Sequence, residues 1–168
     1  LAASSIKALV EIGAVKSEFR PKVHLEVDTG MTRGGFLKEW GKIDGHHVAN
    51  LDVVGIFSHF ARADEPEQEQ NENQRARFKE MVATLESFGY TKIIRHLSNS
   101  AATLKDKESR FDMVRVGIAM YGLSPDVKTL GDSAMLGLKP AMQLRAKLHL
   151  VKTVPANSPV GYGATAYT

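Results

Sequence analysis

The 168-residue chain contains no cysteine, which excludes disulfides, thiolate metal sites and cysteine nucleophiles, and we expect no metal. No apolar run is long enough to span a membrane and no signal-peptide pattern opens the chain, so we expect a cytoplasmic protein without a membrane partner. The basic residues are scattered and the net charge is only +3, which disfavours a nucleic-acid partner. The P-loop pattern G-x-x-x-x-G-K-[ST] is also absent.

The chain has an ordinary globular composition, 43% hydrophobic, in which predicted strands and helices alternate. Apolar spacing predicts an amphipathic helix through Ile6, Leu9 and Gly13, with Leu1 already inside a helix. A second helix carries Phe78 to Leu85 on one face, and Gly89 closes it. Nearly continuous apolar runs predict buried strands over 23–28, 53–59, 93–97 and 111–117. This alternation is typical of an α/β fold with a parallel sheet.

The pattern changes in the last quarter of the chain. Residues 141–150 alternate strictly between apolar and polar side chains, which predicts a half-exposed, antiparallel strand. Residues 122–139 contain several glycines and a proline and read as a linker, so we place a domain boundary near residue 135. Residues 1–135 and 136–168 then belong to different domains. The chain begins and stops inside structural motifs, so we expect a piece of a longer protein.

Polar residues follow each predicted strand. Each has a simple local explanation: Ser98 to Ser100 can cap a helix, and His59 can be a core histidine. An arginine inside an apolar strand is harder to explain, because it cannot lose its charge and needs partners. The carboxyl ends of parallel strands meet on one face, so together these residues predict a single ligand site. The residues are Arg33, His59, Asn99, Ser100, Arg115 and Gly117.

The last two strand ends suggest that this ligand carries a phosphate. A helix that opens at Ser100 offers free N–H groups at the positive end of its dipole. Gly117 lets backbone amides of the next turn approach an anion closely. Phosphate binding by the loops after the last two strands is a recurrent device of (β/α)8 barrels.

Five motifs in this order resemble the alanine racemases, and the resemblance covers essentially the whole chain. They are Asp28-Thr29-Gly30-Met31-Thr32-Arg33, Ser58-His59-Phe60-Ala61, Asn99-Ser100-Ala101-Ala102-Thr103, Met113-Val114-Arg115-Val116-Gly117-Ile118-Ala119-Met120-Tyr121-Gly122 and Gly161-Tyr162-Gly163-Ala164-Thr165. The resemblance implies a homodimeric, pyridoxal 5′-phosphate (PLP)-dependent isomerase that interconverts L- and D-alanine. It implies that this chain holds the C-terminal half of a (β/α)8 TIM-type barrel and the beginning of a mostly antiparallel β domain.

The resemblance also implies a role for each motif residue. Arg33 would contact the phenolic oxygen of PLP, and Arg115, hydrogen-bonded by His59, would face its pyridine nitrogen. Tyr162 would be an acid/base residue that serves the active site of the partner subunit. The phosphate would be held by Ser100 and the backbone of Gly117 and Ile118, with Asn99 beside them. Racemisation needs a base on each face of the α-carbon, which suits a tyrosine and a second base elsewhere.

Two departures from the family pattern matter. Glu26 stands where the family commonly has a carbamylated lysine, and we expect its carboxylate to pair with Arg33. The resemblance implies that the cofactor-binding lysine, which is also the second base, ends the first barrel strand, upstream of Leu1. No lysine here ends a parallel strand in a matching motif. Two other interpretations remain open: a related PLP barrel enzyme, such as a serine racemase or a decarboxylase, and a non-catalytic PLP-binding barrel.

Overall fold

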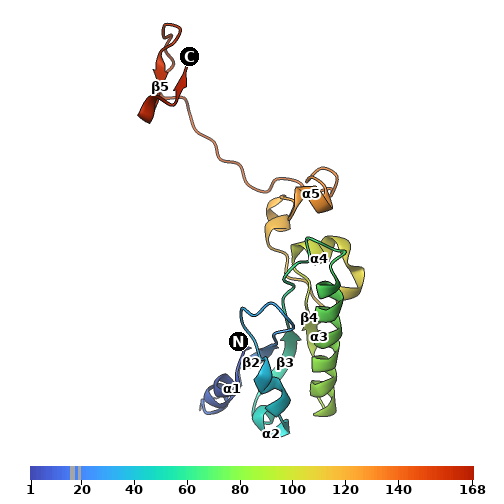
Figure 1. The fold of residues 1–168 in the computed structure, drawn as a ribbon. Helices are drawn as coiled ribbons and strands as arrows, with labels where there is room; N and C mark the ends of the chain where they lie inside the picture. Colours follow the sequence, from blue (N-terminus) through green and yellow to red (C-terminus); the bar gives the residue numbers. More distant parts are fainter. Residues whose placement is uncertain (16–17, 19) are drawn as a thin grey trace.

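The computed structural model describes residues 1–15, 18 and 20–168. A parallel sheet lies beside helices in the N-terminal part of the chain (Figure 1). The sheet has four strands in sequential order: β1 (Ala2–Ala3), β2 (Lys22–Glu26), β3 (Asp52–Phe57) and β4 (Ile94–His96). All neighbouring pairs are parallel. The α/β class with a parallel sheet is therefore confirmed, and the sequential order differs from that of a doubly wound sheet, which reverses direction.

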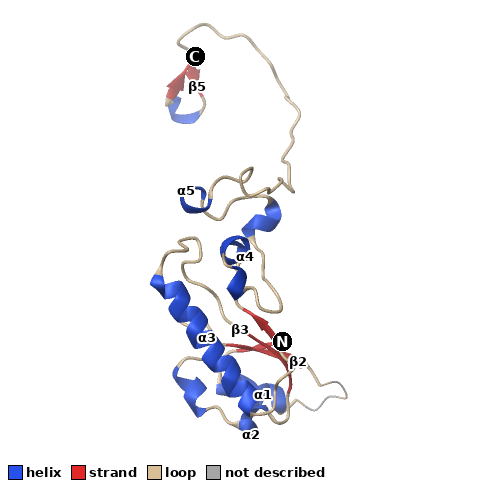
Figure 2. Cartoon of the chain, turned by 90° about the vertical axis from the view of Figure 1, so that its right-hand side faces the viewer, coloured by secondary structure: helices blue, strands red, loops and turns tan. Residues whose placement is uncertain are grey.

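The helices cover the sheet with the apolar faces that the sequence predicts. Helix α1 (Ile6–Gly13) begins after Ser5, whose hydroxyl accepts a hydrogen bond from the N–H of Ala8. The long helix α3 (Glu69–Ser87) buries Phe78, Val82 and Leu85, and Gly89 follows its end with φ of +92° (Figure 2). The shorter elements are η1 (Lys38–Lys42), α2 (Gly45–Val48), α4 (Ser100–Lys105), η2 (Lys107–Ser109), η3 (Ile118–Tyr121) and α5 (Val127–Leu130).

One side of β2 packs into the hydrophobic core, and the other side is more open. Val23 and Leu25 are fully buried, whereas His24 and Glu26, which alternate with them, are only half-buried. The register pairs His24 with Gly55, and Glu26 with Phe57. The side chains of His24, Glu26 and His96 therefore lie on the same face of the sheet, and Glu26 and His96 are the last residues of their strands.

Three expectations about secondary structure are wrong. Leu1 does not lie in a helix, because Ala2–Ala3 forms β1 and pairs with β2. Residues 111–117 run beside β4 without forming a strand, joined to it by bonds from Asp112 N–H to the Arg95 carbonyl and from Arg115 N–H to the Ser98 carbonyl. The positive φ of Phe111, +47°, and the spacing of these two bonds interrupt a regular ladder.

The alternating segment 141–150 also forms no strand. Its apolar side chains are exposed, and Leu144 is fully so, because no strand of the described residues lies beside it to complete the ladder. Beyond it, β5 (Pro159–Val160) and β6 (Ala166–Tyr167) form an antiparallel hairpin around η4 (Tyr162–Ala164). This hairpin stands apart from the sheet at the end of an extended segment (Figure 1). The domain boundary near residue 135 stays a prediction.

Candidate active site

The segments that follow β2 and β3 are tied together by a buried glutamine. Gln74 of α3 is 1% exposed, and its amide donates to Thr29 Oγ1 at 3.2 Å and to the His59 carbonyl at 2.9 Å. Its carbonyl accepts from the N–H of Ala61 at 3.0 Å. Thr29 Oγ1 also lies 2.8 Å from Ser58 Oγ. The two strand ends are therefore fixed to one another and to a helix, which holds His59 in place.

The guanidinium of Arg115 is the centre of the site. Nη1 donates to His96 Nδ1 at 2.8 Å and to the His96 carbonyl at 3.0 Å. Nη2 donates to the Ser58 carbonyl at 2.5 Å and to His59 Nδ1 at 3.2 Å. Its Cζ lies 5.1 Å from the centre of the Phe57 ring, within range of a cation–π interaction. All these acceptors are neutral, so the guanidinium is held in place while its positive charge stays uncompensated by direct contact.

The two histidines around Arg115 are held in their neutral forms. Burial, the positive charge of Arg115 and the neighbouring His24 lower the pKa of His96 to about 4. Burial, Arg115 and Arg33 likewise lower the pKa of His59. Arg115 itself has a lowered pKa, chiefly through burial and also through the nearby charge of Arg33, which the carboxylate of Glu26 opposes. Neutral imidazoles can accept the hydrogen bonds that the guanidinium offers.

A cradle for an anion lies beside Arg115. Ser100 Oγ accepts hydrogen bonds from the N–H of Gly117 at 2.8 Å and of Ala119 at 3.3 Å. Asn99 caps α4, its side-chain oxygen accepting from the N–H of Ala102 at 3.1 Å. A cavity of about 320 Å³ opens here, lined by His59, Asp64, Asn99, Ser100, Ala101, Arg115, Gly117, Ile118 and Pro125. The structure thus brings together six of the predicted site residues: His59, Asn99, Ser100, Arg115, Gly117 and Ile118.

The cradle has the right chemistry for a phosphate group. The N–H of Ile118 has no acceptor within the described part of the chain. A Cβ added to Gly117 would lie 3.8 Å from Ser100 Oγ, so it would occupy the space beside the hydroxyl. Backbone N–H groups, a serine hydroxyl and a neighbouring cation are the donors that phosphate prefers. A ligand that carries a phosphate group therefore fits these residues.

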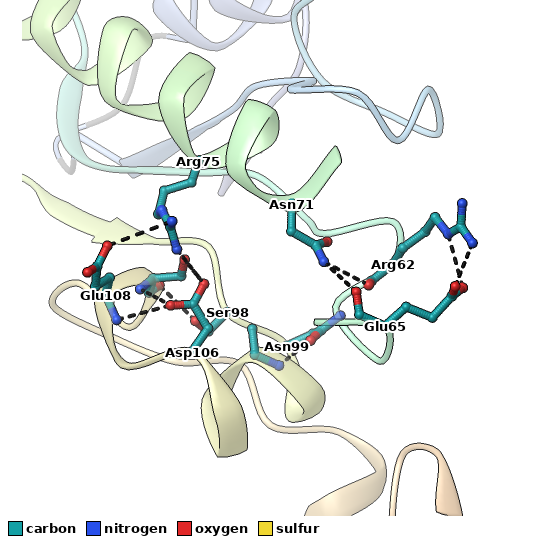
Figure 3. A network of polar contacts seen from close by, with 10 residues as sticks. Arg62, Glu65, Asn71, Arg75, Ser98, Asn99, Asp106 and Glu108 are labelled. Atoms are coloured by element: carbon teal, nitrogen blue, oxygen red, sulfur yellow. Dashed lines mark hydrogen bonds and ion pairs between the residues drawn. The ribbon is translucent and has the colours of Figure 1, made fainter. Parts of the chain in front are cut away.

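A polar network on the other side of α4 holds this helix against α3 (Figure 3). Arg75 donates to Asp106 at 2.9 Å, and Asp106 also accepts from the N–H groups of Glu108 and Ser109. Ser98 Oγ donates to the Ser109 carbonyl at 2.7 Å. The network therefore fixes both ends of the segment that carries Asn99 and Ser100.

Arg33 lies in the loop after β2, exposed but close enough to lower the pKa of His59 and Arg115. The loop is ordered by Asp28, whose carboxylate accepts from the N–H groups of Gly30, Met31 and Thr32. The expected ion pair between Glu26 and Arg33 is absent from the described residues. A Cβ built on Gly34 would lie 3.2 Å from Glu26 Oε1, so the carboxylate packs against the backbone of Gly34 instead.

Tyr162 is not brought into the site. Its side chain is fully exposed in the terminal hairpin, away from the sheet. Conversely, sequence reasoning missed Gln74, His96 and His24. A signal for Gln74 existed, because Asn71, Gln74, Phe78, Val82 and Leu85 lie on one helical stripe, and polar residues on a buried stripe require internal partners. His24 and His96 gave no such signal, since their contact joins strands that are not neighbours.

A family model, related sequences and solved structures that resemble this chain all belong to the same family. Residues 2–125 match the family model described as alanine racemase, N-terminal domain. The alanine racemase of Salinispora tropica is 42% identical over 98% of this chain and 44% of its own length. The alanine racemase of the D-cycloserine producer Streptomyces lavendulae has a TM-score of 0.91 at 42% identity, over 99% of this chain and 46% of that one.

The alanine racemase of Streptomyces coelicolor A3(2) has a TM-score of 0.90 at 39% identity, again over 99% of this chain and 46% of that one. This chain thus spans less than half the length of the relatives that it matches. The family model nevertheless covers the sheet, both helices that flank the site, and Arg33, His59, Ser100 and Arg115. The chain belongs to the alanine racemase family.

Proposed function

We propose that this chain supplies part of the cofactor site of a PLP-dependent alanine racemase, in which β2, β3, β4 and the segment around Arg115 belong to the C-terminal half of a (β/α)8 barrel. The observation that carries the proposal is the guanidinium of Arg115, held by neutral acceptors beside a cradle for a phosphate. The sequential, all-parallel strand order supports the barrel. When bound, PLP supplies an electron sink for the negative charge left after the α-proton is removed.

The residues of this chain would bind and orient the cofactor. Ser100 and the backbone of Gly117 and Ile118 would hold the phosphate, which would replace Ser100 Oγ as the acceptor for the Gly117 N–H. Asn99 would fix the helix that presents Ser100. Arg115 would face the pyridine nitrogen and donate a hydrogen bond to it from Nε, because the four hydrogens on Nη1 and Nη2 already have acceptors. A guanidinium can only donate, so it cannot stabilise a proton on the pyridine nitrogen. The unprotonated ring would withdraw electrons less strongly, which would limit side reactions through a long-lived carbanion. Arg33 would contact the phenolic oxygen.

Proton transfer would need two groups, one on each face of the α-carbon. Tyr162 would serve one face, in the active site of a partner subunit. The second base, a lysine that also binds the cofactor, would come from a part of the protein outside these residues.

The test uses the full-length protein loaded with PLP. We expect the protein to convert L-alanine to D-alanine, as measured by chiral chromatography. We expect Tyr162→Phe to lose this activity. L-Serine is assayed in parallel. If the protein racemised serine but not alanine, serine would replace alanine as the proposed substrate. If it bound PLP but neither racemised nor decarboxylated either amino acid, a non-catalytic PLP-binding barrel would be favoured.

A further inference from the structure

The histidine His24 reaches across a whole strand, because that strand has a glycine in its path. The register places His24 opposite Gly55 of β3, and Gly55 opposite Ile94 of β4. A Cβ on Gly55 would lie 2.3 Å from His24 Nδ1 and 2.8 Å from the Ile94 carbonyl oxygen, closer than carbon can approach. The missing side chain therefore lets the ring of His24 meet that of His96, with Nδ1 of His24 2.7 Å from Nε2 of His96.

The proton positions on His96 and His24 follow from the hydrogen bonds that connect them to Arg115. Arg115 can only donate, so His96 Nδ1, 2.8 Å from Nη1, must be the unprotonated nitrogen. A neutral imidazole has one proton, which must then be on Nε2 of His96. That proton faces His24 Nδ1, which must accept it and be unprotonated too. The hydrogen bonds therefore run in one direction, from Arg115 to His96 to His24.

The surroundings keep both rings neutral. His96 is 4% exposed, stacks on Phe57 at 5.0 Å between ring centres, and lies beside a permanent cation. Burial lowers the pKa of His24, as it lowers that of His96. A charged His24 would place an N–H donor on Nδ1 against the Nε2–H of His96, which would break the series of hydrogen bonds from Arg115 to His24.

We propose that His24 is a positioning residue for Arg115: by accepting from His96 Nε2–H, it holds the His96 lone pair on Nδ1 towards the guanidinium. The proposal rests on the proposed function, because the orientation matters where Arg115 meets PLP. Without the acceptor, the proton of His96 is free to move to Nδ1. Nδ1 and Nη1 would then both be donors, and the guanidinium would lose one of its four acceptors.

The first experiment reads the tautomers directly, in full-length protein labelled with ¹⁵N at histidine and free of cofactor. The His96 signals are identified by their absence in His96→Gln. We expect a proton on Nε2 and none on Nδ1 for both His96 and His24. A proton on Nδ1 of His96 in the unmodified protein would overturn the proposal.

The second experiment compares two variants of His24. His24→Leu removes the acceptor, so we expect a mixture of His96 tautomers and PLP binding weakened about tenfold, as for one lost hydrogen bond. His24→Asn places an amide oxygen near the position of Nδ1, so we expect both properties to return towards those of the parent. His46 on α2 is exposed and outside the site, so His46→Leu and His46→Asn serve as matched controls that should change neither.

The outcomes separate this proposal from the proposed function. Equal losses in His24→Leu and His24→Asn would show that the ring is needed only for packing, and would overturn it. Unchanged tautomers and PLP affinity in His24→Leu would do the same. A parent protein that binds no PLP would instead refute the proposed function, and the tautomers of the cofactor-free protein would still decide the direction of the hydrogen bonds.

Discussion

Replacing Gln74 by methionine should destabilise the protein and loosen the site at the same time. Methionine has a similar length and flexibility, so the change removes the amide with little loss of volume. The Ala61 N–H and the His59 carbonyl lose the partners that the structure gives them at 3.0 and 2.9 Å. Thr29 Oγ1 keeps its contact with Ser58 at 2.8 Å, so it is not left alone.

The magnitude follows from the two groups that lose a partner. A buried polar group without a partner costs about 1–3 kcal/mol, and part of this is regained by the apolar methionine. His59 and Ala61 are half-buried, so we expect the free energy of unfolding to fall by about 1–3 kcal/mol. Urea denaturation of the full-length protein at a fixed protein concentration, with Trp40 as a fluorescent probe in this part of the chain, measures the change.

Asn73→Met on the same helix is the matched control, because Asn73 is exposed and should tolerate the change. Gln74→Glu retains an acceptor for Ala61 N–H but places an oxygen against the His59 carbonyl, so we expect it to be no more stable than Gln74→Met. A loss below about 0.5 kcal/mol in Gln74→Met, or an equal loss in Asn73→Met, would refute the reasoning, since surface changes are of that size.

Four further outcomes are expected. Arg115→Glu in the full-length protein should weaken racemisation and increase transamination, because a carboxylate there favours a protonated ring nitrogen; unchanged rates of both would contradict this. Glu26→Gln should weaken PLP binding by less than about 1 kcal/mol, since Glu26 acts on Arg115 only through its charge; a larger loss in a PLP titration would point to a direct contact. The folded-state pKa of His96, about 4, lies below that of an unfolded histidine, about 6.5, so its contribution to stability is full above pH 6.5 and decreases by about 1.4 kcal/mol for each pH unit as the pH drops from there towards 4; His96→Gln should flatten that part of the pH–stability curve. The 168-residue chain expressed alone should form no D-alanine with added PLP, because it has no lysine in a matching motif and leaves sheet edges unpaired; turnover would show that the catalytic lysine has been misplaced.

The sequence alone determined the α/β class, the order of the main elements and most of the candidate site. Periodicity was sufficient to predict α1 and α3, because the spacing of the apolar residues identifies both the helix and its buried face. The ends of β2, β3 and β4 were also predictable, because polar residues follow continuous apolar runs there. Proximity of His59 and Ser100 then followed from one rule, that parallel strands end on the same face. Arg115 joins them from a segment that forms no strand, through the bond from its N–H to the Ser98 carbonyl.

Only the tertiary structure decided what depends on a neighbour distant in sequence. Residues 141–150 have the alternation of a strand but lack a partner among the described residues, and a strand needs one. The carboxylate of Glu26 packs against the backbone of Gly34 rather than pairing with Arg33. The meeting of His24 and His96 over Gly55 depends on the register of three strands, which no single segment encodes. Local patterns fix an element and its buried face, whereas hydrogen bonds between side chains are fixed only when packing sets their distances.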